Sequence, residues 1–206
     1  MATWVMKLMY GAGYPALIFL MFAENVFPPI PSELIMPLAG YMVTRRQLSF
    51  LGIVLAGTLG SVLGALPLYY AGRGLGEERV MAWADRHGRW LTVSRKDLER
   101  AKRWFARHGG MAVLVCRLIP GVRSLISIPA GIERMPVAAF LAYTSVGAGL
   151  WTTLLAAVGY SLGGKYKEVE QYLDPVSYVV LGGIVVLYLV RVVRHEGQAP
   201  PAKHAA

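Results

Sequence analysis

The sequence predicts an all-α polytopic membrane protein. Of its 206 residues, 55% are hydrophobic and only 16% are charged, whereas a soluble globular domain carries roughly 25% charged residues. The mean hydropathy is +0.47. Cys116 is the only cysteine, so the chain can form neither an internal disulfide nor a CxxC metal or redox site. These observations exclude the soluble globular and the disulfide-rich secreted classes.

Two uninterrupted apolar segments are long enough to cross a bilayer. They cover residues 47–71 and 136–163, contain no charged residue and exceed the roughly 20 residues that a spanning helix needs. Pro67 is expected to kink the first. A third, shorter segment covers residues 175–193 and is also predicted to span, because Arg191 can extend its charged end to the membrane interface.

Two further apolar segments are interrupted in the middle. Residues 14–41 contain three prolines within Phe27-Pro28-Pro29-Ile30-Pro31-Ser32-Glu33, and residues 111–131 contain Ile119-Pro120-Gly121. Proline lacks a backbone donor and disfavours helical geometry in the preceding residue, and the halves on either side are too short to span. Each segment is therefore predicted to form a re-entrant hairpin. Irregular backbone at membrane depth is stable only where protein buries it or where it lines a wet cavity, so two hairpins indicate a transport site.

The two halves of the chain repeat one unit, a hairpin followed by a spanning helix. Pro37-Leu38-Ala39-Gly40 matches Pro129-Ala130-Gly131 near the end of each hairpin. Identically spaced matches follow: Phe50 with Phe140, Gly57 with Gly147 and Tyr70 with Tyr160. The shared order of these features indicates an internal repeat.

The distribution of basic residues predicts how the repeats are oriented. Residues 72–110 contain ten basic and five acidic residues, which places them in the cytoplasm by the positive-inside rule. Arg191, Arg194 and Lys203 place the C-terminus there too, whereas residues 165–174 fall outside. The two hairpins then enter from opposite faces. Such inverted-topology repeats are typical of secondary transporters, whose broken helices meet near the midplane.

The cytoplasmic segment 72–110 is predicted to be amphipathic and helical in part. Ser94-Arg95-Lys96-Asp97 is typical of a helix start and Gly109-Gly110 of a helix end. This helix either lies on the anionic inner leaflet or packs on the protein, and its periodicity does not distinguish the two. Gly72-Arg73-Gly74-Leu75-Gly76 is interpreted as a helix end, and residues 195–206 as a disordered tail.

Four ionisable residues lie within the two hairpins: Glu24, Glu33, Arg117 and Arg123. Each costs roughly 2.5 to 3.5 kcal/mol at the centre of a membrane helix, so they need partners or water. They either form ion pairs that only hold the hairpins together or build a site. Arginine binds phosphate through two parallel hydrogen bonds, and the Pro-Gly turn between the arginines exposes backbone N–H groups. Burial favours the neutral form of glutamate and nearby arginine the charged form, so the carboxylates can exchange protons or bind cations.

The segments from Glu24 to Glu33 and from Arg117 to Arg123 resemble the signature of the DedA family, also called SNARE-associated or VTT-domain proteins. Tyr70-Ala71-Gly72-Arg73 and the Pro-Ala-Gly ending of the second hairpin belong to the same resemblance. It implies an inner-membrane protein that translocates lipid, with undecaprenyl phosphate as the bacterial substrate and phospholipid scrambling in eukaryotic relatives. It also implies an essential acidic pair and an essential arginine pair, which match the four hairpin charges. Some members carry Asp in place of Glu33, at a different spacing.

The predicted function is therefore a flippase in the bacterial inner (plasma) membrane that moves undecaprenyl phosphate or a related anionic lipid between leaflets, coupled to protons or cations. Arg117 and Arg123 are predicted to bind substrate, and Glu24 and Glu33 to couple protons or cations. The residues predicted to support them are Pro29, Pro31, Pro120, Gly121, Tyr70 and Arg73. No cofactor, metal, enzyme activity or nucleic-acid partner is expected, and the oligomeric state, a homo-oligomer included, stays open.

Two alternatives remain. In a proton-coupled antiporter for cations or small cationic drugs, the carboxylates would bind substrate and the arginines would tune their protonation. A lipid-phosphate phosphatase would also use arginine, but it needs a nucleophile or metal cluster that the sequence pattern does not indicate.

Overall fold

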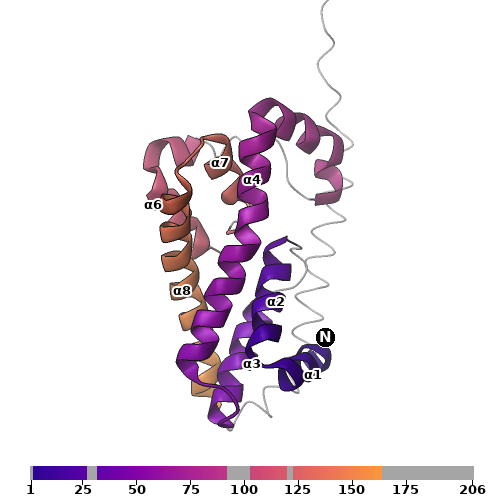
Figure 1. Ribbon diagram of the computed structural model, residues 1–206, viewed down its shortest axis with the longest axis vertical. Coiled ribbons are helices and arrows are strands. Elements are labelled where there is room, and N and C mark those ends of the chain that lie inside the picture. Colours follow the sequence, from indigo (N-terminus) through magenta and orange to yellow (C-terminus); the bar gives the residue numbers. More distant parts are fainter. Residues whose placement is uncertain (1, 27–31, 92–102, 120–122, 164–206) are drawn as a thin grey trace, which may run out of the picture.

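The computed structural model describes residues 2–26, 32–91, 103–119 and 123–163, and all regular structure in these ranges is helical. The helices are α1 (Ala2–Ala12), α2 (Tyr14–Val26), α3 (Ser32–Thr44), α4 (Phe50–Leu91), α6 (Gly110–Arg117), α7 (Ser127–Ile132) and α8 (Val137–Leu162). Helices α4 and α8 run side by side along the length of the molecule (Figure 1). Helix α1 was not predicted, and it buries Val5 and Met9 against the rest of the protein.

The two uninterrupted apolar segments form the two long helices. Residues Phe50–Glu77 and Val137–Leu162 are long and apolar enough to cross a membrane. Helix α4 continues past Gly72, where an end was expected, and departs from helical geometry at Gly76, with φ 71° and ψ 173°. Glycine adopts a positive φ without a Cβ clash, so the chain changes direction there, whereas Pro67 lies inside the helix.

Both long helices expose a stripe of large apolar side chains. The stripes repeat every four residues, the spacing of one helix face. Their members are 40% to 67% exposed and are Leu51, Leu55, Leu59 and Leu63 on α4, and Val146, Leu150, Leu154 and Val158 on α8. Continuous apolar surface of this kind is unfavourable in water and favourable against lipid. The stripes are therefore suited to contact with acyl chains.

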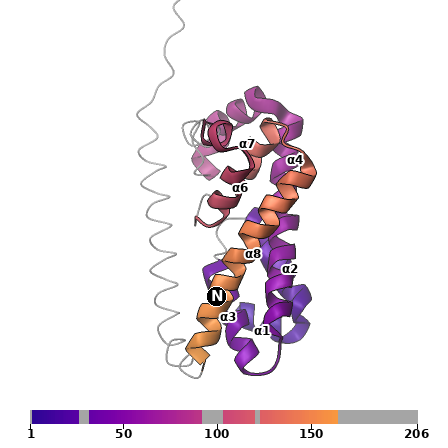
Figure 2. The ribbon, with the colours of Figure 1, turned by 90° about the vertical axis from the view of Figure 1, so that its left-hand side faces the viewer.

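Each proline-interrupted segment forms two short helices instead of one straight helix. Residues 14–41 are divided between α2 and α3, and residues 111–131 between α6 and α7. Helices α2 and α3 occupy one end of the molecule, and α6 and α7 the other (Figures 1 and 2). Within the first pair, α3 tolerates Pro37 in its interior.

Each hairpin packs on the long helices of both halves of the chain, one arm on each. The first arm of each hairpin packs on the long helix of its own half, α2 on α4 and α6 on α8. The second arm packs on the long helix of the other half, α3 on α8 and α7 on α4. Neither half can separate from the other without exposing both second arms, so the halves form a single unit.

Glycines allow the second arms to approach the long helices closely. A Cβ atom on Gly40 of α3 would collide with the backbone oxygen of Ala156, and one on Gly131 of α7 with that of Tyr69. The reverse contacts follow the same plan, because a Cβ on Gly159 would collide with Pro37. Likewise, a Cβ on Gly72 would collide with the backbone oxygen of Ile128. Small residues at helix crossings are the usual means of close packing in membranes.

The same contacts correct the pairing of the long helices that the sequence matches suggested. Gly147 of α8 meets the backbone oxygen of Leu114 on its first arm, whereas on α4 both Gly60 and Gly64 meet backbone oxygens of α2. Against the second arms the equivalent glycines are Gly72 and Gly159, and their spacing differs from that of the sequence matches by three residues, nearly one helical turn.

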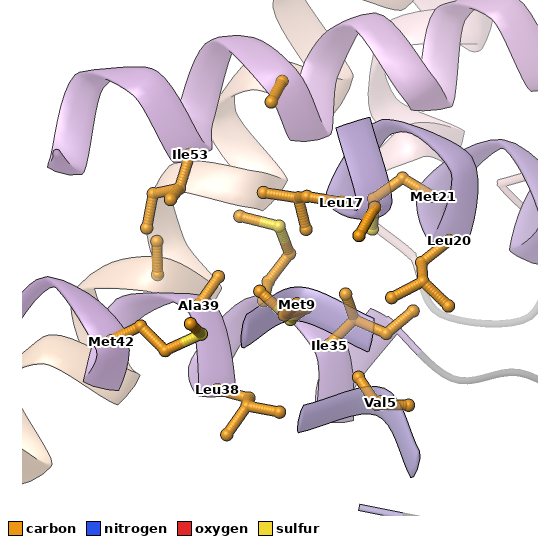
Figure 3. Close-up of a cluster of buried hydrophobic side chains, with 14 of the residues drawn as sticks. Val5, Met9, Leu17, Leu20, Met21, Ile35, Leu38, Ala39, Met42 and Ile53 are labelled. Atoms are coloured by element: carbon orange, nitrogen blue, oxygen red, sulfur yellow. The ribbon is translucent and has the colours of Figure 1, made fainter. Parts of the chain in front are cut away.

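Two apolar clusters stabilise the two ends. The first joins α1, α2, α3 and α4 (Figure 3), and its labelled members are Val5, Met9, Leu17, Leu20, Met21, Ile35, Leu38, Ala39, Met42 and Ile53. The second contains Tyr69, Phe140 and Ile126. It also buries Phe105, within the helical residues 103–108 that precede Gly109. The described end of the connecting helix thus packs on the protein.

Several predicted features lie outside the described residues. They are the helix start at Ser94–Asp97, the third span at residues 175–193 and the tail at residues 195–206.

Candidate functional site

The four hairpin charges lie where the short helices end. Glu24 is near the C-terminal end of α2, and Glu33 is in the first turn of α3. Arg117 is the last residue of α6, and Arg123 lies in the turn before α7. Because the prolines and the Pro-Gly turn stop each helix inside the protein, polar side chains from both halves of the chain reach the same region.

Arg123 joins both arms of the first hairpin. Its Nη2 atom forms an ion pair with Oε1 of Glu24 and lies 3.8 Å from Oε1 of Glu33. The side chains of Arg123 and Glu24 are 9% and 5% exposed, whereas that of Glu33 is 41% exposed. The pair with Glu24 is therefore buried, and Glu33 lies on the open side of the site.

Arg117 is buried but has a different set of partners. Its Nη1 donates to Oδ1 of Asn25 at 3.1 Å, and its Nη2 donates to Oγ of Ser127 at 3.0 Å. The Oγ of Ser124 also donates to Asn25 Oδ1, at 3.4 Å. Among the described residues, Nε of Arg117 has no hydrogen-bond partner and no carboxylate oxygen lies within 4.0 Å of the guanidinium. The charge of Arg117 is thus solvated by neutral groups.

Helix α8 supplies the wall on which both arginines lie. The Cζ atom of Arg123 is 5.8 Å from the ring centroid of Trp151, within the range of a cation–π interaction. The indole Nε1 of Trp151 donates to Oγ of Ser32 at 3.3 Å, so this ring contacts both hairpins. On the same helix, a Cβ at Gly147 would lie 2.7 Å from Cβ of Arg117, which explains why the backbone of α8 carries no side chain there.

Sequence reasoning missed the neutral members of this cluster. Asn25, Ser127 and Trp151 all contact a predicted arginine, and none was named in advance. Asn25 is the only asparagine in the chain and directly follows Glu24, and Trp151 is the only tryptophan within the uncharged segment 136–163. Either rarity could have drawn attention to them.

Two of the predicted supporting residues, Tyr70 and Arg73, have their contacts outside this cluster. Tyr70 is 53% exposed and contacts the ring of Tyr69. Arg73 donates from Nη1 to the hydroxyl of Tyr69 at 2.8 Å, and that hydroxyl donates to the backbone oxygen of Met135. These residues connect α4 to the turn before α8. Pro29, Pro31, Pro120 and Gly121 lie outside the described residues.

The arrangement offers anion chemistry in a buried setting. Two guanidinium groups, three neutral hydrogen-bonding side chains and two carboxylates converge, and the four charges sum to zero. Where a guanidinium meets phosphate, charge-assisted hydrogen bonds replace those it makes in the empty site. Within the described ranges, no three His, Cys, Asp or Glu side chains group in a way that could hold a metal ion.

Known proteins match this chain over most of its length. Residues 30–161 match the family model described as the VTT domain. The chain is 38% identical to the "Alkaline phosphatase-like protein" of Lactococcus lactis subsp. cremoris over 90% of its own length and 87% of the relative's. It is 37% identical to "Undecaprenyl phosphate transporter A" of Staphylococcus aureus over 93% of its own length and 94% of the relative's. It is 27% identical to "Protein DedA" of Escherichia coli over 94% of its own length and 88% of the relative's. No solved structure matches the chain.

Proposed function

This chain belongs to the VTT-domain family, to which DedA belongs, and we propose from that premise that it transports an anionic lipid phosphate between the leaflets of the bacterial inner membrane. The observation that carries the proposal is the buried meeting of both hairpins at Arg117 and Arg123. The names of the transporters from Staphylococcus aureus and Bacillus subtilis support undecaprenyl phosphate as the lipid.

The lipid tail needs no binding site of its own. Each buried CH₂ group gains about 0.8 kcal/mol in the bilayer, so the tail stays in the hydrocarbon while only the charged head must be screened. In the proposed mechanism the phosphate binds between the arginines and displaces Glu24 and Glu33 from Arg123. The displaced carboxylates take up protons or a cation, and their return to Arg123 releases the lipid and resets the site.

The proposed topology is a pair of inverted repeats with re-entrant hairpins and a cytoplasmic C-terminus. The exchange of second arms between α4 and α8 supports it, since a two-fold axis between the long helices would produce that exchange. The position of the two hairpins at opposite ends of the molecule also supports it (Figure 2).

The proposal is tested by leaflet-resolved transport of undecaprenyl phosphate in liposomes that contain the purified protein. Wild type should accelerate exchange between leaflets over protein-free liposomes. Arg117→Ala should slow it by about ten- to a hundredfold, because a hydrogen bond to a charged group contributes about 1.5–3 kcal/mol. Wild-type liposomes with no more exchange than protein-free ones would refute the proposal.

Hydrolysis of the lipid phosphate is a second candidate, favoured by the printed name of the Lactococcus lactis relative. The same liposomes distinguish the two functions. Transport leaves the phosphate ester intact, whereas hydrolysis releases inorganic phosphate in proportion to time and protein. Steady phosphate release that Arg117→Ala abolishes would establish the phosphatase.

Replacing Arg123 with lysine should reduce transport by about tenfold while leaving the thermal midpoint of the detergent-solubilised protein near that of wild type. Lysine keeps the positive charge but loses the planar group that binds phosphate through two parallel bonds and stacks on Trp151. Arg107→Lys, at an exposed position in the connecting helix, is the matched control and should transport like wild type. Full activity of Arg123→Lys would contradict the proposal that Arg123 binds phosphate through two parallel hydrogen bonds.

A further inference from the structure

Asn25 is held in a single orientation by four neighbours. It is 2% exposed. Its Nδ2 donates to the backbone oxygen of Met21 at 3.0 Å and lies 3.5 Å from Oε2 of Glu24. With Nδ2 committed in this way, Oδ1 is turned toward Arg117 and Ser124. The amide therefore presents an acceptor to the guanidinium without presenting a charge.

The two arginines differ in how their charge is compensated. Arg123 has two carboxylates within 4.0 Å, whereas in the described part of the chain the side chains that bond to Arg117 are Asn25 and Ser127, both neutral. Leaving a buried cation without an opposite charge is costly. An aspartate at position 25 has the same shape as asparagine and would remove that cost, yet the chain has its only asparagine here.

The described part of the chain contains two buried side-chain polar atoms without a partner, Nε of Arg117 and Oγ1 of Thr144. Thr144 lies on α8 one turn before Gly147, the glycine that faces Arg117. Both unpartnered atoms thus lie on the two helices that meet at Arg117. Donors left free in a buried position are suited to a ligand that brings its own acceptors.

We propose that Asn25 is a positioning residue that orients Arg117 through a neutral contact in place of an ion pair, so that Arg117 is the primary contact for the phosphate oxygens of the lipid. Arg123 binds the phosphate second, because its ion pairs with Glu24 and Glu33 must break before it can do so. The inference rests on the proposed function and adds a division of labour between the arginines. It names the phosphate monoester group, a dianion or monoanion, as the ligand of Arg117.

Two substitutions at Asn25 separate this role from a purely structural one. Asn25→Asp keeps the shape and the acceptor that faces Arg117, adds a negative charge there, and replaces the Nδ2 donor to Met21 and Glu24 with an oxygen. Asn25→Ser keeps neutrality but shortens the side chain. If Asn25 only supported the fold, the loss of binding in each variant would follow its loss of thermal midpoint. If Asn25 keeps Arg117 out of an ion pair, Ser is the milder change for anion binding, although it is the less faithful in shape.

The experiment measures binding of undecaprenyl phosphate to the full chain in nanodiscs, together with leaflet-resolved transport and the thermal midpoint of each variant. Asn25→Asp should raise the Kd about tenfold or more, because a new ion pair with Arg117 competes with the phosphate, and this loss should exceed that of Asn25→Ser at a comparable thermal midpoint. Asn25→Ser should bind more tightly than Asn25→Asp. Gln47→Glu makes the same amide-to-carboxylate change at an exposed position and should bind like wild type.

Three results would overturn the inference. Wild-type affinity in Asn25→Asp would show that the charge at position 25 is irrelevant. Weaker binding by Asn25→Ser than by Asn25→Asp would show that Asn25 acts through shape alone. If the wild-type protein neither binds nor transports undecaprenyl phosphate, the proposed function itself is wrong. This outcome is distinguishable from the first two, because it is seen in the wild-type protein and not only in a variant.

Discussion

Arg123→Ala is expected to abolish lipid transport and also to destabilise the protein, by about 3–5 kcal/mol. The reason is that Arg123 is the buried partner of Glu24, and removing one member of a buried ion pair leaves the other as an uncompensated charge. Transport is measured in liposomes, and stability by the thermal midpoint of the protein in detergent. Arg117→Ala should lower stability less, because the partners it leaves behind are neutral.

The double variant Arg123→Ala, Glu24→Ala separates the two effects. Removing both members of the pair removes the unpaired charge, so the thermal midpoint should recover most of the loss seen in Arg123→Ala. Transport should stay absent, because Arg123 is lost as the second contact of the phosphate and Glu24 as the buried carboxylate that the phosphate displaces. A double variant that transports at the wild-type rate would show that the pair only holds the hairpins together, the alternative that the sequence alone could not exclude.

Gly159→Ala is expected to have the second largest effect, a loss of about 1–3 kcal/mol of stability together with reduced transport. The added Cβ would collide with the backbone of Pro37, which cannot rotate away as a side chain can, so α3 must move off α8. Because α3 carries Glu33, its displacement alters the site as well as the packing. The thermal midpoint and the transport rate are the measurements.

Gly149→Ala on the same helix is the matched control. A Cβ there would lie 3.7 Å from Oγ1 of Thr58, an ordinary van der Waals distance. Alanine is also the better helix former by up to about 1 kcal/mol, so this variant should be at least as stable as wild type. Equal stability of the Gly159→Ala and Gly149→Ala proteins would mean that the crossing of α3 and α8 is looser than described.

Much of the fold could be predicted because its signals are local. Unbroken apolar length identified both spanning helices, and the prolines identified where the other two apolar segments divide. Helix α1 escaped prediction because its eleven residues are too few to cross a membrane, and its burial comes from distant residues of the first apolar cluster. The continuation of α4 beyond Gly72 was also missed. A run of glycines weakens a helix in isolation, but here Gly72 is the close contact with Ile128.

The sequence by itself determined which charged residues would need an ion-pair or hydrogen-bond partner inside a membrane. Four charges in two apolar, proline-broken segments are costly once those segments enter the membrane, and the apolar length that indicates such a place is read from the sequence alone. The family could be identified from the same segments, and the comparisons confirm that identification.

Only the tertiary structure decided which charge meets which partner. Asn25 and Arg117 are 92 positions apart, and Glu24 and Arg123 are 99 positions apart. Their contacts depend on how glycine crossings set the height of each hairpin against α4 and α8. A shift of one helical turn, the size of the displacement between the sequence match and the packing repeat, would move a side chain by about 5.4 Å, more than the length of any hydrogen bond. For this physical reason it could not be predicted from the order of the residues that Arg123 is paired with a carboxylate while Arg117 is bonded to neutral side chains.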